Sequence, residues 1–192
     1  EHAPSGAFRS VLSAQTKIDD NYTGELGADW EHRFSPTFST KLIGLINVNN
    51  AIQHDIFNTT SYTASPSNIR TQDRDTNGGE RVGRLTATWR ASKDHTVEFG
   101  GEGAFNFRET HLDIFSQVPP GSTPVRVPLA VSNARVEEVR GEAFVTDVWT
   151  VNKQLTLETG FTYEASRITQ TGDQAKEREF SYPKPRVTAT WA

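Results

Sequence analysis

Cysteine and methionine are both absent from the 192 residues of the chain. Without cysteine the chain can form neither disulfides nor thiolate metal sites. Long apolar runs are absent too, and no segment approaches the ~18 consecutive apolar residues of a transmembrane helix, which excludes a helical membrane protein. The formal net charge of -4 gives no basic surface, so we expect no nucleic-acid partner.

Catalytic patterns are missing as well. The histidines form no His-x-x-x-His pair for a metal, and there is no Gly-x-Ser-x-Gly elbow, so we expect no enzyme activity, cofactor or metal site. One motif leaves calcium open, because Asp73–Gly78 has the D-x-D-x-N-G opening of a calcium loop. Arg84 stands where the closing Glu belongs, which favours a solvated polar loop.

Hydrophobic residues are scarce: they make up 34% of the chain, and the mean hydropathy is -0.59. Such values usually argue against a membrane protein and even for disorder. A transmembrane β-barrel is the exception, because only alternate residues of each strand face lipid. Alternation is what this sequence contains.

The clearest alternation runs from Arg84 to Arg108. Apolar residues occupy every second position up to Trp89 and again from Val97 to Phe107, on either side of the turn-like Ala91–Asp94. Period-two patterns with a short turn predict an antiparallel hairpin with one apolar face. The second strand exceeds ten residues, whereas strands average ~5–6 and a tilted strand crosses a bilayer with ~9–11. The hairpin therefore predicts two spans of an outer-membrane β-barrel.

The whole chain predicts an all-β fold, an antiparallel transmembrane barrel wall of about eight meandering strands. The expected strands are residues 6–16, 22–34, 38–50, the hairpin 84–108, 139–151, 155–165 and 185–191. Tight turns are expected at Ser35–Thr37, Ala91–Asp94 and Asn152–Lys153, and loops at Lys17–Asn21, Asn58–Asn77, Thr110–Asn133 and Thr171–Glu179. Because short and long connections alternate in outer-membrane barrels, we expect the tight turns at one rim and the longer loops at the other.

The four tryptophans strengthen this prediction. Each lies on the apolar side of an expected strand, shortly before a tight turn or the chain end: Trp30, Trp89, Trp149 and Trp191. Indole has an apolar body and one N–H donor, so it favours the boundary between hydrocarbon and head groups. We interpret the four as a lipid-interface girdle. The alternative is that they pack in the core of a soluble β-sandwich.

Charged residues fill the opposite side of the expected strands. We predict that these face the lumen: Arg84, Glu98, Glu102, Arg108, Glu138, Arg140, Glu142 and Glu158. Opposite charges on neighbouring strands can pair across a ladder. Such a face is either a wetted lumen wall or a surface that docks an internal domain. Asp147 falls on the apolar side, where a bulge or a position in the interface would accommodate it.

Several segments resemble the barrel of a proteobacterial TonB-dependent outer-membrane receptor. They are Val127–Glu138, Arg140–Phe144, Leu155–Gly160, Glu164–Ser166 and Phe180–Val187. The resemblance implies a bacterial outer-membrane location and a 22-stranded barrel around a plug domain, on which the TonB complex pulls. It also implies a small-molecule cargo such as an iron chelate, cobalamin or a saccharide, which the sequence does not identify, and outer-membrane lipid as a partner.

The chain contains no plug-like segment or TonB box, and it does not begin with Met. We therefore expect residues 1–192 to be an excerpt of the barrel wall. The alternative is a complete eight-stranded barrel with an interior filled by side chains, acting as a structural or surface-binding module. The two cases differ in whether the first and last strands pair with each other.

Overall fold

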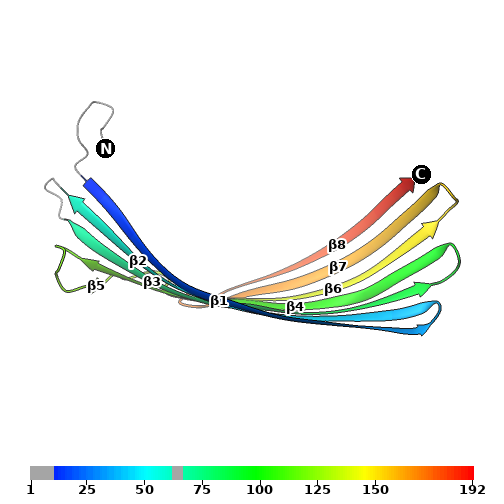
Figure 1. Cartoon of the computed structure of the whole chain (residues 1–192), viewed down its shortest axis with the longest axis horizontal. Helices are drawn as coiled ribbons and strands as arrows, with labels where there is room; N and C mark the ends of the chain where they lie inside the picture. Colours follow the sequence, from blue (N-terminus) through cyan, green and yellow to red (C-terminus); the bar gives the residue numbers. More distant parts are fainter. Residues whose placement is uncertain (1–10, 62–66) are drawn as a thin grey trace, which may run out of the picture.

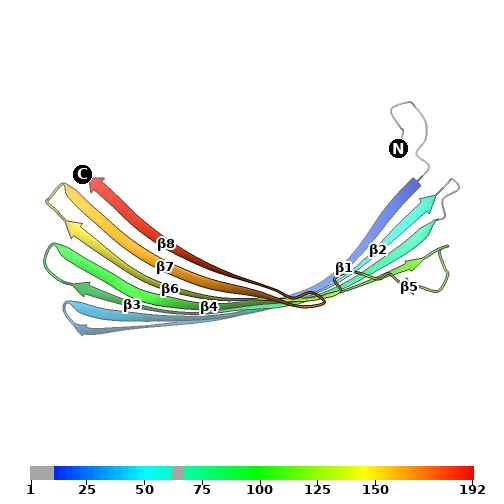
Figure 2. The same ribbon diagram turned by 180° about the vertical axis from the view of Figure 1, so that it is seen from behind.

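One curved antiparallel sheet forms the described part of the chain, residues 11–61 and 67–192 of the computed structural model (Figures 1 and 2). Its strands are β1 (Val11–Ser35), β2 (Phe38–Ser61), β3 (Asn68–Arg90), β4 (His95–Gln117), β5 (Val125–Arg126), β6 (Asn133–Thr150), β7 (Leu155–Gly172) and β8 (Lys176–Trp191). The sheet order is β1-β2-β3-β4-β6-β7-β8, with the short β5 paired to β4. The predicted all-β meander of about eight strands is confirmed.

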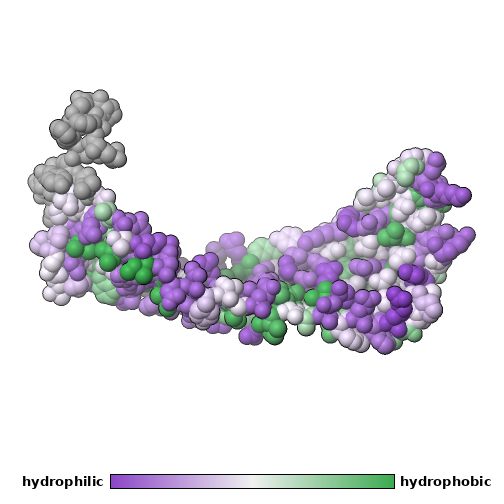
Figure 3. Space-filling model, viewed as in Figure 1, coloured by the Kyte–Doolittle hydropathy of each residue, from purple (hydrophilic) through white to green (hydrophobic). Residues whose placement is uncertain are grey.

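The seven long strands present two different faces. The side chains that share a face with Trp30 form the apolar face, and those that share a face with Glu102 form the polar face. Most large apolar side chains that are exposed lie on the apolar face; the exceptions are Val118, Val125, Val136, Val148 and Tyr182. Both ribbon views show no second layer over either face of the described sheet, and apolar side chains lie open on the surface (Figure 3).

Three tight turns lie at one end of the sheet, as predicted. Side chains hold each turn by accepting backbone N–H groups that the ladder leaves free. Ser35 Oγ accepts the N–H of Thr37 at 3.2 Å, and Ser92 Oγ accepts that of His95 at 3.1 Å. Asn152 Oδ1 accepts the N–H of Leu155 at 3.0 Å. The C-terminus lies at the same end, and the connections 118–132 and 173–175 lie at the other (Figure 1), of which only the first is long.

The predicted loops were mostly wrong. Lys17–Asn21 lies inside β1, so two expected strands are one strand of 25 residues. Of Asn58–Asn77, residues 58–61 belong to β2 and residues 68–77 to β3, while residues 62–66 lie outside the described residues; only residues 118–132 of Thr110–Asn133 connect β4 with β6. Thr171–Glu179 shrinks to a connection at 173–175. These segments are rich in polar side chains, and apolar ones such as Leu112 and Ile114 lie on the polar face, so they lack the expected pattern; the ladder nevertheless binds backbone groups whatever the side chains are.

The sheet is open in the described residues. β1 pairs with β2 only, and β8 pairs with β7 only, which confirms an arc over a closed eight-stranded barrel. The part of the expected first strand at residues 6–10 lies outside the described residues. No bulge interrupts β6, so Asp147 stays on the apolar face and the bulge alternative is wrong. No helix that is long and apolar enough to cross a membrane occurs in the described ranges.

Candidate functional site

The eight predicted charged residues all lie on the polar face, and the register brings some of them together. Glu102 forms the main contact, because one of its oxygens bonds Arg84 Nη1 at 3.2 Å and the other bonds Arg140 Nη2 at 2.9 Å. The Glu102 side chain is only 17% exposed. The guanidinium of Arg84 also stacks 4.5 Å above the ring of Phe144. The three charges therefore form a bridge across β3, β4 and β6.

The other predicted charges have different surroundings. Glu138 accepts from Asn106 Nδ2 at 3.2 Å, and Glu158 pairs with Arg186. Glu98, Arg108 and Glu142 have no ion pair among the described residues, and they remain open to a partner. A depression of about 460 Å³ lies beside two of them, lined by Arg84, Glu98, Glu142, Phe144, Lys184 and Arg186 among others.

The predicted lumen-facing set lacks the two ion-paired cations of β8, although Arg186 falls opposite the apolar side of the expected strand 185–191. Lys184 Nζ bonds Glu164 at 2.8 Å, and Arg186 pairs with Glu158. Alternation from Trp191 back towards Pro183 would have placed both cations on the polar face. Pro183 and Pro185 weaken the strand pattern there, although they suit a strand that exposes one edge.

The four tryptophans lie on the apolar face, and each is exposed by between 41% and 68%. They do not lie in one register row. The row of Trp30 passes through Leu85 and Ala143 and reaches β8 at Pro183, whereas Trp191 lies eight residues farther along β8. Trp89 and Trp149 lie progressively farther from the same row. The offset therefore grows in one direction across the sheet.

This offset has the slope that tilted membrane strands produce. Eight residues span about 26 Å along a strand, and six steps between strands span about 29 Å across the sheet. A line through Trp30 and Trp191 therefore makes an angle of about 40° with the register rows. Transmembrane strands tilt by ~35–45°. In strands with that tilt, the four indoles would lie at the same depth in the membrane.

A second boundary lies farther from the tight turns. It is marked by one charged or amide side chain on each long strand of the apolar face, the first met from the tight turns on every strand except β3 and β6, where Arg81 and Asp147 come earlier: Asp20, Asn50, Asn77, Glu109, Glu137, Arg167 and Glu179. It is ten residues from the tryptophan on β1 and twelve on β3, β6 and β8. We call the surface between these boundaries the apolar band. Its length is close to the ~9–11 residues that cross a bilayer.

Two charged side chains lie inside the apolar band of the described strands, Arg81 and Asp147. Asp147 lies two residues from Trp149 along β6, close to the tight turns. Its Oδ2 is 2.8 Å from His95 Nδ1, and the His95 ring stacks on Trp149 with 5.4 Å between centroids. The interface position predicted for Asp147 therefore has a polar partner and an aromatic neighbour.

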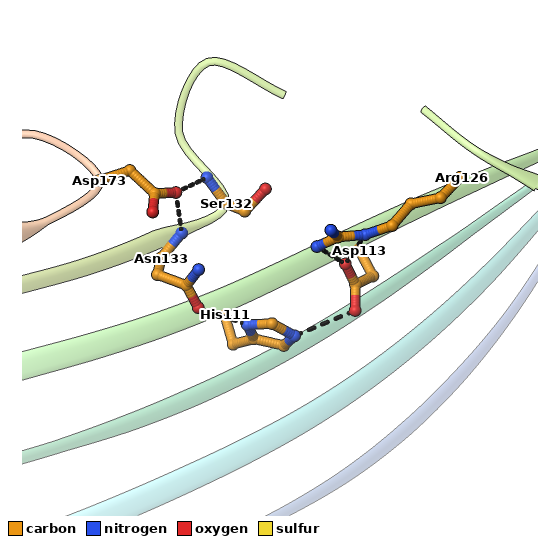
Figure 4. Close-up of polar contacts among 6 residues, drawn as sticks. All are labelled: His111, Asp113, Arg126, Ser132, Asn133 and Asp173. Carbon is orange, nitrogen blue, oxygen red and sulfur yellow. Dashed lines mark hydrogen bonds and ion pairs between the residues drawn. The ribbon is translucent and has the colours of Figure 1, made fainter. Parts of the chain in front are cut away.

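Beyond the band, a polar cluster ties the 118–132 connection to the sheet (Figure 4). Asp113 on β4 binds the guanidinium of Arg126 on β5, with Nε 2.7 Å from its Oδ1. His111 Nδ1 is 2.6 Å from Asn133 Oδ1, and His111 Nε2 is 3.0 Å from Asp113. The bonds to Asn133 and Asp113 raise the pKa of His111, and the bonds from Arg126 lower the pKa of Asp113.

Asp173 closes the same cluster from the connection between β7 and β8. Its Oδ2 accepts the backbone N–H of Ser132 at 2.6 Å and that of Asn133 at 2.8 Å (Figure 4). Both bonds lower the pKa of Asp173, because they stabilise its charged carboxylate. The bond from the N–H of Asn133 has the larger effect and that from Ser132 the smaller. The start of β6 is therefore held by a side chain from the next connection.

The calcium motif does not form a loop. Asp73–Gly78 lies within β3, where Asp75 and Asn77 accept from Asn50 Nδ2 at 3.3 and 2.6 Å. A calcium loop has to wrap its oxygens around one ion, which an extended strand cannot do. Over residues 11–61 and 67–192, no group of three or more His, Cys, Asp or Glu side chains is placed to hold a metal ion.

Comparison with known proteins gives the family. Residues 3–192 match the family described as TonB dependent receptor-like, beta-barrel, and the chain belongs to it. This family comprises transporters and receptors, and its barrels reside in the bacterial outer membrane. No curated protein matches the chain.

Two solved structures are similar to the chain. The ferric citrate transporter FecA in its unliganded form has 14% sequence identity and a TM-score of 0.44, over 81% of this chain. BauA, the ferric preacinetobactin receptor from Acinetobacter baumannii, has 12% identity and a TM-score of 0.45, over 88% of this chain. The match covers 25% of the FecA chain and 28% of the BauA chain, so this chain spans about a quarter of each.

Proposed function

We propose that this chain is a stretch of the barrel wall of a receptor that takes up a scarce small molecule across the bacterial outer membrane. The apolar band faces lipid, with Trp30, Trp89, Trp149 and Trp191 as the girdle nearest the tight turns. The observation that carries this orientation is the tilt of the band, because both of its boundaries descend together across the sheet. A sandwich core would have no reason to keep such a slope.

The polar face lines the lumen in this proposal. In the bridge, Glu102 pairs with both Arg84 and Arg140, which leaves one net positive charge and suits a wetted wall. Glu98, Arg108 and Glu142 have no such partner in the described part of the chain, and they face the plug or the cargo. A plug domain, the TonB complex and a small-molecule cargo are the partners that membership of the family supports.

Residues 1–192 form one barrel segment without a plug domain. The free edges of β1 and β8 support a place in a wider wall, for which we expect 22 strands, because an exposed edge leaves its N–H and C=O groups without partners. In the alternative, a complete eight-stranded barrel, β1 would pair with β8. The register of the described residues shows no such pairs.

Uptake by intact cells tests the proposal. A strain that lacks the receptor is compared with its parent and with a TonB-deficient strain, and each is supplied with labelled iron chelates, cobalamin or saccharides. We expect loss of uptake of one class in both mutant strains, and recovery when the receptor gene is restored. Unchanged uptake of all three classes in the receptor-deficient strain would contradict the proposal.

A further inference from the structure

Two prolines lie inside the strands of the described sheet, and both are on β8, at a free edge. Pro183 and Pro185 occupy alternate positions of this strand. Proline has no backbone N–H and cannot donate to a ladder, so it is confined to sheet edges and bulges. The other free edge, β1, contains no proline among its 25 residues. The two edges that are open to further strands therefore differ in their backbone donors.

The missing donors of β8 face away from β7. The N–H of Ala192 donates to the C=O of Gln154 at 3.0 Å, and the register between β7 and β8 continues from there without a shift. In an antiparallel pair, successive residues turn their N–H and C=O groups alternately towards the partner strand and away from it. Even-numbered residues of β8 therefore bond β7, whereas odd-numbered residues, which include both prolines, face the free edge.

The gap in the row of donors lies at the middle of the apolar band. Pro185 is six residues from each boundary of the band on β8, and Pro183 lies two residues farther from the tight turns. Along the free edge, Ser181 and Val187 are the nearest residues that can donate on either side of the prolines. They are six residues apart, which is about 20 Å of strand. A strand paired with this edge would find no N–H donor at mid-membrane.

The cost of such a gap depends on its surroundings. Two C=O groups of a neighbouring strand would lack a donor, which is unfavourable in hydrocarbon and is tolerated where the backbone lines a water-filled cavity. The side chains next to the prolines are Tyr182, Lys184 and Arg186, and all three are exposed on the polar face. Water can therefore reach the edge from this face, while the two proline rings lie on the apolar face.

We propose that the strand next to β8 in the complete wall pairs with it in two separate ladders, at residues 177–181 and 187–191. Water from the lumen fills the break between the ladders and bonds the C=O groups that the prolines leave without donors. This inference rests on the proposed function, which puts a further strand at this edge and the lumen on the polar face. A strand beside β1 meets no such gap, so the seam beside β8 is the weaker of the two.

Amide hydrogen exchange of the complete receptor in detergent micelles tests the break without any substitution, when fragmentation in the mass spectrometer resolves single amides. The N–H groups of Val187 and Ala189 both face the free edge, and Val187 adjoins the gap. We expect Val187 to exchange about tenfold faster than Ala189, relative to the intrinsic rate of each, because one backbone hydrogen bond fewer supports it. Fraying from the rim would give the opposite order, since Ala189 lies nearer the tight turns.

Pro183→Val/Pro185→Val supplies the two missing donors. In this variant Val187 should exchange as slowly as Ala189, and the receptor should unfold in dodecyl sulfate at a temperature a few degrees higher. The rise is informative because replacing proline loosens the unfolded chain, which by itself lowers stability. Pro128→Val is the matched control, because it adds an N–H in the 118–132 connection. It should neither slow the exchange of Val187 nor raise the unfolding temperature.

The exchange pattern separates a failure of this inference from a failure of the proposed function. Slow exchange of both Val187 and Ala189 in the wild type would contradict the break and leave the wider wall intact. So would unchanged exchange of Val187 in the folded double variant, or in Pro185→Val if the double variant does not fold. Fast exchange of both residues would mean that no strand lies beside β8, which contradicts the proposed wall and this inference with it.

Discussion

The two halves of each long strand share one backbone ladder and differ in their side chains. In the turn-proximal half of β3, residues 77–90, apolar and polar residues alternate from residue 83 onwards; in the turn-distal half, residues 68–76, Ile69 is the one large apolar side chain. The ladder to β4 continues through both halves without a shift. The difference teaches that the ladder sets the length of the strand, whereas the surroundings of each face set its pattern.

The largest effect should come from a charge placed in one half and then in the other. Leu85→Arg puts a cation in the middle of the apolar band, and Asn77→Arg puts it on the same face of the same strand at the boundary. The first change should destabilise the barrel folded in lipid vesicles by ~2–4 kcal/mol, and the second should destabilise it by ~0–1 kcal/mol. Equal losses in denaturant titrations of the two variants would show that the band does not face lipid.

Alternation explains which parts of the fold the sequence could predict. The turn-proximal hairpin around Trp89 has period-two alternation and a Ser-containing turn, so its position and its faces follow from local chemistry. The turn-distal part of β3 has none of this, because it is polar on both faces apart from Ile69, and Asp73 is typical of a loop residue. Residues 68–76 form a strand only because their backbone pairs with the neighbouring strands β2 and β4.

The candidate site also has a part that follows from the sequence pattern and a part that depends on the fold. The face of Glu102 follows from parity, but its double contact with Arg84 and Arg140 depends on the register of three strands. The cluster of His111 and Asp113 joins β4, β5 and β6, and Asp173 adds the next connection. A single sequence contains no pattern that brings such segments together.

The second effect compares ion pairs in the two halves. Glu102→Ala leaves two arginines without their carboxylate at a site where the Glu side chain is only 17% exposed. We expect a loss of ~1–3 kcal/mol in folding free energy. Glu109→Ala breaks the turn-distal pair with Arg135, in which both side chains are at least 41% exposed, and should cause no measurable change. Comparable losses for both variants would remove the distinction between the halves.

A smaller effect is a pH dependence confined to the turn-distal half. The pKa of His111 in the folded chain is raised above its usual 6.5. The protonated imidazole therefore contributes fully to the stability of this cluster below pH 6.5, and that contribution is lost as the pH rises through the folded pKa. Amide exchange in the 118–132 connection should therefore become faster between about pH 6 and 8, while the apolar band stays unchanged. In His111→Gln the exchange should show no such step beyond the intrinsic pH dependence. A step of the same size in this variant would assign the effect to another group.

Single-cysteine scanning along β3 in the complete receptor tests the central claim most directly, and this segment contributes no cysteine of its own. Each position from Asn68 to Arg90 receives a nitroxide label, and relaxation by oxygen, which enriches in lipid, is compared with relaxation by a water-soluble nickel complex. We predict that oxygen dominates at every second position from Arg81 to Trp89, and that nickel dominates on both faces from Asn68 to Asn77. Oxygen-dominated alternation along the whole strand, or its absence between Arg81 and Trp89, would contradict a membrane-spanning band confined to the turn-proximal half.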